Sequence, residues 1–178
     1  YQEILNKEIP SIVTADYLVY TFQNILKEAY KEIEKNAFFD SLWALDKNLY
    51  DVAQTRFKQR DFEMGLSQDV LLEGMRMETS FLAVVLKLLQ PIPEQIETSE
   101  AFLNPNKFST QEADNYSIEL PQSIEDQVEA EVNMIRGASG IQKSPILLYN
   151  IDYSRFEIPE DYVDNAKLTN FYLAKRWL

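Results

Sequence analysis

The chain has 178 residues, a net charge of −12, and neither cysteine nor histidine. This composition excludes disulfides and thiol chemistry, and it removes the usual general base and zinc ligand. The acidic excess argues against binding to nucleic acid or to an anionic membrane surface, because both need clustered lysine and arginine. A hydrophobic content of 46% with four glycines favours a helical protein with a sizeable core.

Three amphipathic helices are predicted in the first half of the chain. Residues 14–36 place apolar side chains on one helical face, and Thr14 and Asp16 are both suitable N-caps for that helix. Residues 38–60 repeat the pattern, and the short link predicts that these two helices are antiparallel neighbours. The third helix, residues 67–90, begins at a capping Ser67 and is apolar nearly all round in its second half. It should therefore be central and buried.

The second half combines an acidic connection with further helices. Residues 91–122 are predicted to be an acidic, loop-rich connection, and residues 1–178 are predicted to form a single helical domain or part of a larger one. A capping box at Ser123 then opens a helix, and a last helix is predicted to begin at a capping Asp164. The predicted fold is all-α: an irregular bundle of about five to six helices with a short extended segment near 144–151.

The stretch "KSPILLYNIDYSRF" (residues 143–156) differs from the helical pattern around it. Pro145 biases Ser144 away from helix, and the apolar run after it has the length of one buried extended segment. Asp152 and Ser154 are suited to accept local backbone N–H groups and so to fix a turn.

Aromatic side chains are expected to hold that turn. Tyr153 and Phe156 are large enough to anchor it in the core, with Phe156 buried against the helix that begins near Asp16 or the one that ends at Trp177. The Asp152 carboxylate should then be hydrogen-bonded and shielded from solvent. We interpret the stretch as a structural clasp between two helices, with an active site as the alternative.

A cluster of acidic residues follows the same stretch. Carboxylates in this number suit a calcium or magnesium site, whereas a solvated acidic loop whose last member caps a helix is the plainer interpretation. The cluster consists of Asp152, Glu157, Glu160, Asp161 and Asp164.

Three separated stretches together resemble a bacterial family catalogued as domain of unknown function 3160. In the first stretch, a Pro and a Val-Thr-x-Asp pattern open a helix; in the second, Gly precedes Ser-Pro-Ile and Asp-Tyr-Ser-x-Phe; the third is the closing aromatic helix. The matching residues are Pro10, Val13, Thr14, Asp16, Leu18, Gly140, Ser144, Pro145, Ile146, Asp152, Tyr153, Ser154, Phe156, Ala174 and Trp177.

The resemblance implies an α-helical protein, often exported or lipid-anchored at the cell envelope, with no established activity. It also implies a longer family domain, so the remainder of the chain's own polypeptide is an expected partner. Family members often carry histidines where this chain has Tyr20, Gln23 and Ala138. After Phe156, "IPEDY" keeps Tyr162 alone of a Pro-Arg-Gly-His-Tyr run. If the histidines and the arginine of family members carry out chemistry, this chain has lost it.

Two hypotheses follow for function. The first is a non-enzymatic binding or structural module that recognises a protein or a small ligand. The second is a hydrolase-like or metal-dependent enzyme whose catalytic residues lie outside these 178 residues. We assign no catalytic, cofactor-binding or metal-binding residue and predict no cofactor. The longest apolar run, residues 81–89, contains Lys87 and is too short to span a bilayer.

Overall fold

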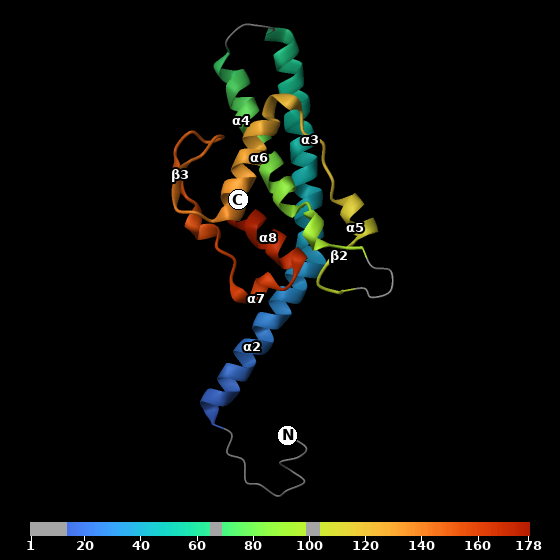
Figure 1. Ribbon diagram of the computed structural model, residues 1–178, viewed down its shortest axis with the longest axis vertical. Coiled ribbons are helices and arrows are strands. Elements are labelled where there is room, and N and C mark those ends of the chain that lie inside the picture. The colour runs from blue at the N-terminus through green and yellow to red at the C-terminus, as the bar shows by residue number, and fades with distance from the viewer. Residues whose placement is uncertain (1–13, 65–68, 99–103) are drawn as a thin grey trace, which may run out of the picture.

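The computed structural model describes residues 14–64, 69–98 and 104–178. One long helical rod forms its first part (Figure 1). Helix α2 (Ala15–Ile33) passes through a π-helical turn, η1 (Glu34–Phe38), directly into α3 (Phe39–Met64). The predicted antiparallel arrangement of these two helices is therefore wrong. The link contains neither glycine nor proline, so the backbone continues as helix instead of turning back.

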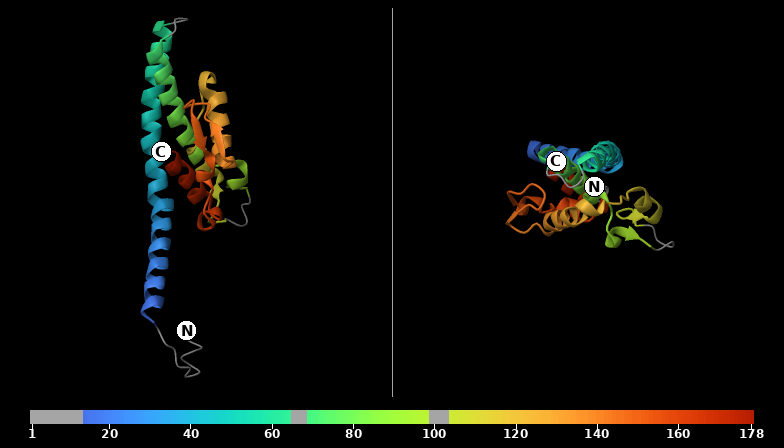
Figure 2. Two further views of the ribbon diagram at one scale, coloured as in Figure 1. Left: turned by 90° about the vertical axis from the view of Figure 1, so that its left-hand side faces the viewer. Right: turned by 90° about the horizontal axis from the view of Figure 1, so that it is seen from above.

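Helix α4 (Val70–Leu89) is the centre of the molecule, as its sequence predicts. It runs antiparallel beside α3, and the remaining elements pack on its other side (Figure 2). All residues of the segment 83–89 except Lys87 are fully buried. Asp69 caps the N-terminal end, and the Ser67 predicted for this role lies outside the described residues.

Short elements fill the stretch between α4 and the next long helix. A 3₁₀ turn (η2, Pro93–Gln95) leads into β1 (Ile96–Glu97), which pairs in parallel with β2 (Phe108–Ser109). Helix α5 (Thr110–Asn115) follows, at a place where a loop is predicted. Its signal was present, since Ser109 and Glu112 form a capping box.

The C-terminal part returns to helix. Its elements are α6 (Gln122–Gly137), β3 (Ile141–Lys143), β4 (Asn150–Asp152), η3 (Tyr153–Phe156), α7 (Glu160–Val163) and α8 (Ala166–Trp177). The fold class is confirmed: the protein is a mostly helical, multi-helix bundle with small strands.

Three local predictions need correction. Helix α6 begins one residue before Ser123, with Pro121 at the N-cap, so the predicted capping box does not form. Asn165, not Asp164, caps α8. The extended residues flank the apolar run rather than coincide with it: β3 and β4 pair antiparallel, and residues 144–149 form the loop between them.

Helix α4 ends inside the protein, where Pro91 prevents its continuation. The last carbonyl groups of a helix have no partner within the helix itself. Here the Arg136 guanidinium of α6 donates to the carbonyls of Lys87 and Leu88, at 3.5 and 3.3 Å. The Asn170 amide of α8 donates to those of Leu89 and Gln90, at 3.2 and 3.3 Å. Side chains from two other helices thus complete α4.

Unlike the carbonyl groups at the end of α4, the buried carboxyl group of Asp46 has an oxygen without a hydrogen-bond partner among the described residues. It lies on the buried face of α3 with 2% of its surface exposed. Its Oδ2 atom finds no hydrogen-bond donor in the described parts of the chain. Burial raises the pKa of this carboxyl to about 7, because the charged form is disfavoured away from water.

The buried Asp46 predicts a pH-dependent stability. Its folded-state pKa lies above the unfolded value, so its contribution is most favourable below about pH 4 and is lost as pH rises through about 7. Asp46→Asn should therefore be more stable than the wild type at pH 8, by on the order of 3 kcal/mol. Urea unfolding of both proteins from pH 5 to pH 8 measures the difference. A difference that does not shrink toward pH 5 would contradict this assignment.

Candidate functional site

The residues of the second and third family-like stretches come together between α6 and α8. Gly140 opens the hairpin with a φ of 63°, a backbone conformation that glycine adopts readily. Its carbonyl accepts a hydrogen bond from the Tyr153 N–H at 2.8 Å, which closes the hairpin at its base. Tyr153 and Phe156 then direct their rings into the core.

A buried carboxylate lies at the centre of this region. Glu131, on α6, has no exposed surface. Its Oε2 atom accepts a hydrogen bond from the Ser144 hydroxyl at 2.5 Å, and its Oε1 atom accepts one from the Tyr153 hydroxyl. Burial, together with the neighbouring Glu131, raises the pKa of Tyr153, so its hydroxyl remains a donor. These two bonds join α6 to both sides of the hairpin.

Ser144 also organises the loop between the strands. While its hydroxyl donates to Glu131, its oxygen accepts from the N–H groups of Ile146 and Leu147, at 3.2 and 2.9 Å. Pro145 lacks an N–H group, so it leaves no donor unsatisfied in this tight loop. The Ser-Pro pair therefore forms a side-chain-stabilised turn where an extended segment was expected.

The 3₁₀ turn η3 directly follows β4, the second strand of the hairpin. Asp152 caps it, accepting from the N–H and the hydroxyl of Ser154 at 3.1 and 2.7 Å. The predicted hydrogen bonds of Asp152 are present, but its predicted shielding is wrong, because the residue is exposed. The hairpin ends at the surface, so solvent reaches this carboxylate.

Phe156 joins the turn to α8. It is 1% exposed, and its ring centre lies 6.5 Å from that of Trp177. The prediction that it packs against the helix ending at Trp177 is confirmed. Trp177 in turn stacks on Phe81 of α4 at 5.1 Å and donates from its indole nitrogen to the Phe81 carbonyl. Arg155 and Arg176 exchange hydrogen bonds at the rim of this contact.

The first family-like stretch does not reach this region. Thr14 caps α2, its hydroxyl oxygen accepting from the Tyr17 N–H at 3.2 Å, and Asp16 lies in the first turn. Both residues are at the far end of α2 from the hairpin (Figure 1). Pro10 lies outside the described residues.

The acidic residues that suggested a cation site are dispersed. Asp161 forms an ion pair with Lys27 of α2, and Asp152 serves its own turn. In the described part of the chain, no three acidic side chains gather closely enough to hold a metal ion.

Sequence reasoning missed Glu131, which is one of several acids in its helix. Its position in the apolar stripe next to Val128, Val132 and Ile135 was the available signal. Because both of its oxygens are held by hydroxyl groups, the Glu131 carboxylate is suited to fixing the hairpin on α6.

Comparison with known families accounts for the shared pattern. The family model described as "Protein of unknown function (DUF3160)" matches residues 1–178. The chain belongs to this family. No curated protein and no solved structure matches it. Among the helices of the DUF3160 chain that the structure describes, none has both the length and the apolar character needed to cross a membrane.

The buried network predicts unequal roles for two tyrosines of the hairpin region. Tyr153→Phe removes one of the two hydroxyl groups that hold Glu131, and should lower the free energy of unfolding by about 1–3 kcal/mol. Tyr149→Phe is the matched control, since Tyr149 is 59% exposed, and should change it by less than about 0.5 kcal/mol. Urea denaturation of both variants checks this, and equal effects would count against the clasp.

Proposed function

We propose that this DUF3160 chain is a non-enzymatic helical module of a bacterial cell-envelope protein, and that it binds an amphipathic protein helix through the apolar face of α2. Its place at the envelope rests on the family resemblance alone. The binding role is supported by one observation: α2 presents large apolar side chains that the rest of the described structure does not cover.

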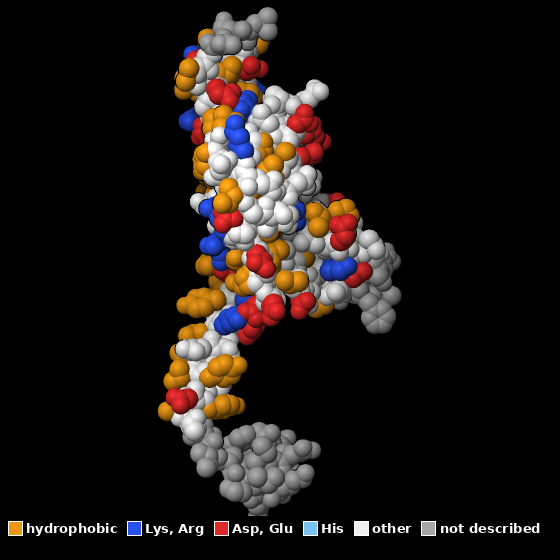
Figure 3. Space-filling model, turned by 60° about the vertical axis from the view of Figure 1, so that its left-hand side comes forward, with side chains coloured by type: hydrophobic (Ala, Val, Ile, Leu, Met, Phe, Trp, Pro, Cys, Tyr) orange, Lys and Arg blue, Asp and Glu red, His pale blue; other side chains and the backbone are white. Residues whose placement is uncertain are grey.

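The exposed face of α2 follows the helical repeat. None of the residues of α2, all of which the structure describes, is buried. Hydrophobic side chains are visible along its surface, where it projects from the rest of the molecule (Figure 3). Those on the exposed face are between 39% and 61% exposed, apart from Tyr30 at 62%. They are Leu18, Val19, Phe22, Ile25, Leu26, Tyr30 and Ile33.

The size of this face fits a protein partner. Seven large side chains that are about half exposed offer roughly 700 Å² of apolar surface. Monomeric proteins seldom expose contiguous apolar patches above a few hundred Å² without a binding role. A standard protein interface buries about 800 Å² on each partner. The face of α2 is therefore close to the area that one stable interface needs.

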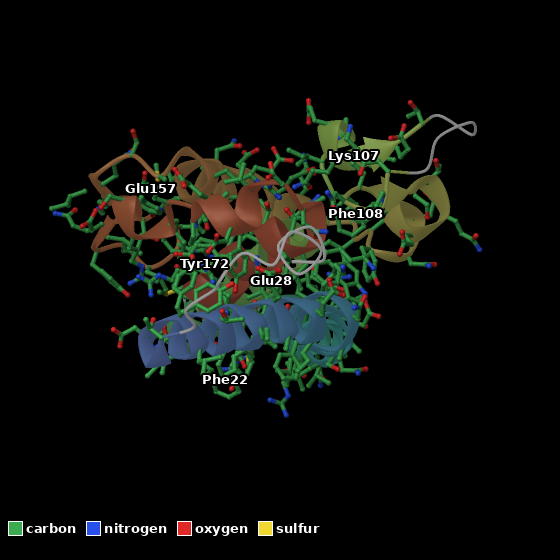
Figure 4. The ribbon with its side chains drawn as sticks, turned by 90° about the horizontal axis from the view of Figure 1, so that it is seen from below. Phe22, Glu28, Lys107, Phe108, Glu157 and Tyr172 are labelled. Carbon is green, nitrogen blue, oxygen red and sulfur yellow. The ribbon has the colours of Figure 1, made fainter. Side chains whose placement is uncertain are left out.

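The orientation of α2 is fixed from its other side. The carboxylate of Glu34, at the start of the π turn, accepts from Lys175 and from Tyr162, both at 2.6 Å. Lys27 pairs with Asp161 on the same side. Phe22 lies on the opposite side of the helix from Tyr172 of α8 (Figure 4). Near its junction with the bundle, the chain is thus held through Lys27 and Glu34, and the apolar face of α2 is turned away from these contacts.

Charge favours a protein over a lipid surface. Amphipathic helices that lie on anionic membranes present free lysines and arginines beside their apolar face. Within α2, the lysines are Lys27 and Lys31, against Asp16, Glu28 and Glu32. Both lysines are paired, Lys31 with Glu28 at 2.6 Å and Lys27 with Asp161. The helix therefore offers a lipid headgroup no excess positive charge.

Site-specific photo-crosslinking in the native bacterium tests this function. A photoreactive amino acid at Phe22 should form a crosslink to a helical peptide, which mass spectrometry assigns to the same polypeptide or to a separate protein. The matched control is the same substitution at Asn24, an exposed position on the other side of α2, where little crosslinking is expected. Equal yields at the two positions, or a lipid adduct at Phe22, would contradict the proposal.

A further inference from the structure

The apolar face of α2 continues beyond the π turn onto α3. At the last position of the turn and along α3, four large side chains are between 50% and 59% exposed. Their spacing of seven, four and three residues places them on one face of the helix. The rest of the molecule lies to one side of the rod (Figure 2). The four residues are Phe38, Leu45, Leu49 and Val52.

The π turn brings this face into line with the apolar face of α2. Ile33 and Phe38, on either side of the turn, are five residues apart. In a π turn the backbone bonds residues five apart, as the Phe39 N–H does with the Glu34 carbonyl. Such residues are neighbours on one face, as residues four apart are in an α-helix. The rod therefore carries one apolar stripe, to which α2 contributes Val19, Leu26, Tyr30 and Ile33.

This stripe is symmetric about the π turn. If two rods lie side by side in opposite directions with their π turns adjacent, apolar positions of one meet apolar positions of the other. One register serves all of them, because the two members of each pair lie equally far from the same point in the turn. A two-fold symmetric interface requires such a self-complementary surface. The facing pairs are Val19 with Val52, Leu26 with Leu45, and Ile33 with Phe38.

A pocket of about 310 Å³ lies at the middle of the stripe. Phe38, Leu42 and Leu45 form one wall, and Phe171 of α8 lies in the other. In the antiparallel arrangement, Ile33 of the second copy reaches this pocket, because it faces Phe38. The pocket therefore offers a seat for an apolar side chain at the centre of the interface, where such contacts contribute most to binding.

Charges at the two ends of the stripe match the same register. Asp16 lies three residues before Val19, and Arg56 lies four residues after Val52, so both flank the stripe. Both are exposed, and neither forms an ion pair with another described residue. The antiparallel arrangement places Asp16 of each copy beside Arg56 of the other. Such pairs at the rim of an interface favour one register over others.

We propose that two copies of this chain form an antiparallel, two-fold symmetric dimer along the rod, in which α2 of each copy packs on α3 of the other. This inference rests on the proposed function, because it names α3 of a second copy as the helix that the α2 face binds. The eight residues of the stripe offer roughly 800 Å² of apolar surface on each copy. A standard interface buries about that area on each partner.

Sedimentation equilibrium tests the dimer. At about 50 μM, above the micromolar dissociation constants of weak interfaces of this size, we expect twice the 20.8 kDa mass of one chain. Leu49→Asp places a charge in the stripe opposite Phe22 of the second copy, and should give the mass of one chain with unchanged helical content. Leu71→Asp is the matched control, because Leu71 lies on α4 and is 55% exposed, against 50% for Leu49. It should remain a dimer.

Disulfide formation tests the register, since the chain contains no cysteine of its own. Val19→Cys and Val52→Cys are prepared as separate proteins, mixed and oxidised. The mixture should form a disulfide-linked dimer of one chain of each kind. Each protein alone should not, because equivalent positions of the two copies would be about 50 Å apart in the antiparallel rod.

Three results would overturn the dimer. They are the mass of a single chain for the wild type, a dimer for Leu49→Asp, and self-linked single-cysteine proteins at the yield of the mixture. The proposed function has a separate outcome: a crosslink from Phe22 to a helix of a different protein would leave it standing while the dimer fails. The absence of any helical crosslink from Phe22 would refute both.

Discussion

The C-terminal end of α4 lies inside the protein, and its carbonyl groups must find donors there. Leu86, Leu88 and Leu89 in the last turn of the helix are fully buried. An unsatisfied buried carbonyl costs about 1–3 kcal/mol, and four of them would cancel much of a domain's stability. The Gln90 N–H donates to the Leu86 carbonyl. The Arg136 guanidinium donates to the next two carbonyls, and the Asn170 amide donates to the two after those. This requirement sets where α6 and α8 must lie.

The hairpin and the η3 turn then hold those two helices in place. Glu131 ties α6 to Ser144 and Tyr153, and Phe156 carries the connection on to Trp177 of α8. Because Trp177 stacks on Phe81, the chain returns to α4 about two turns before its end. The clasp and the capped helix end are thus parts of one arrangement around α4. A polar network of this kind favours one relative placement of helices, since other placements would leave Glu131 buried without partners.

Local signals in the sequence predict a large part of this fold. Periodicity identifies the long helices, the apolar second half of α4 predicts its burial, and Thr14 and the aromatic pair Tyr153 and Phe156 behave as their local patterns indicate. Some failures are local, such as the unpredicted α5 and the caps of α6 and α8, and the others involve continuity or distance. The residues between α2 and α3 include neither glycine nor proline, so the helix continues through a π turn where a reversal of the chain was expected. Glu131, Arg136 and Asn170 bond to residues far away in the chain, and of the three only Glu131, which lies in the apolar stripe of α6, carries a local sign of its burial.

Helix α2 stands outside this arrangement, and its apolar face has no role in completing α4. If the fold depends on the capped end of α4, a substitution of Asn170 should show it most directly. Asn170→Leu keeps the size of the side chain but leaves the Leu89 and Gln90 carbonyls and the Gln95 amide without their partner. Asn48→Leu is the control, since the Asn48 amide bonds to an exposed carbonyl on α3. Urea unfolding should show a loss of about 2–4 kcal/mol for Asn170→Leu and less than about 0.5 kcal/mol for Asn48→Leu. Equal, small losses would show that the fold does not depend on the capped end of α4.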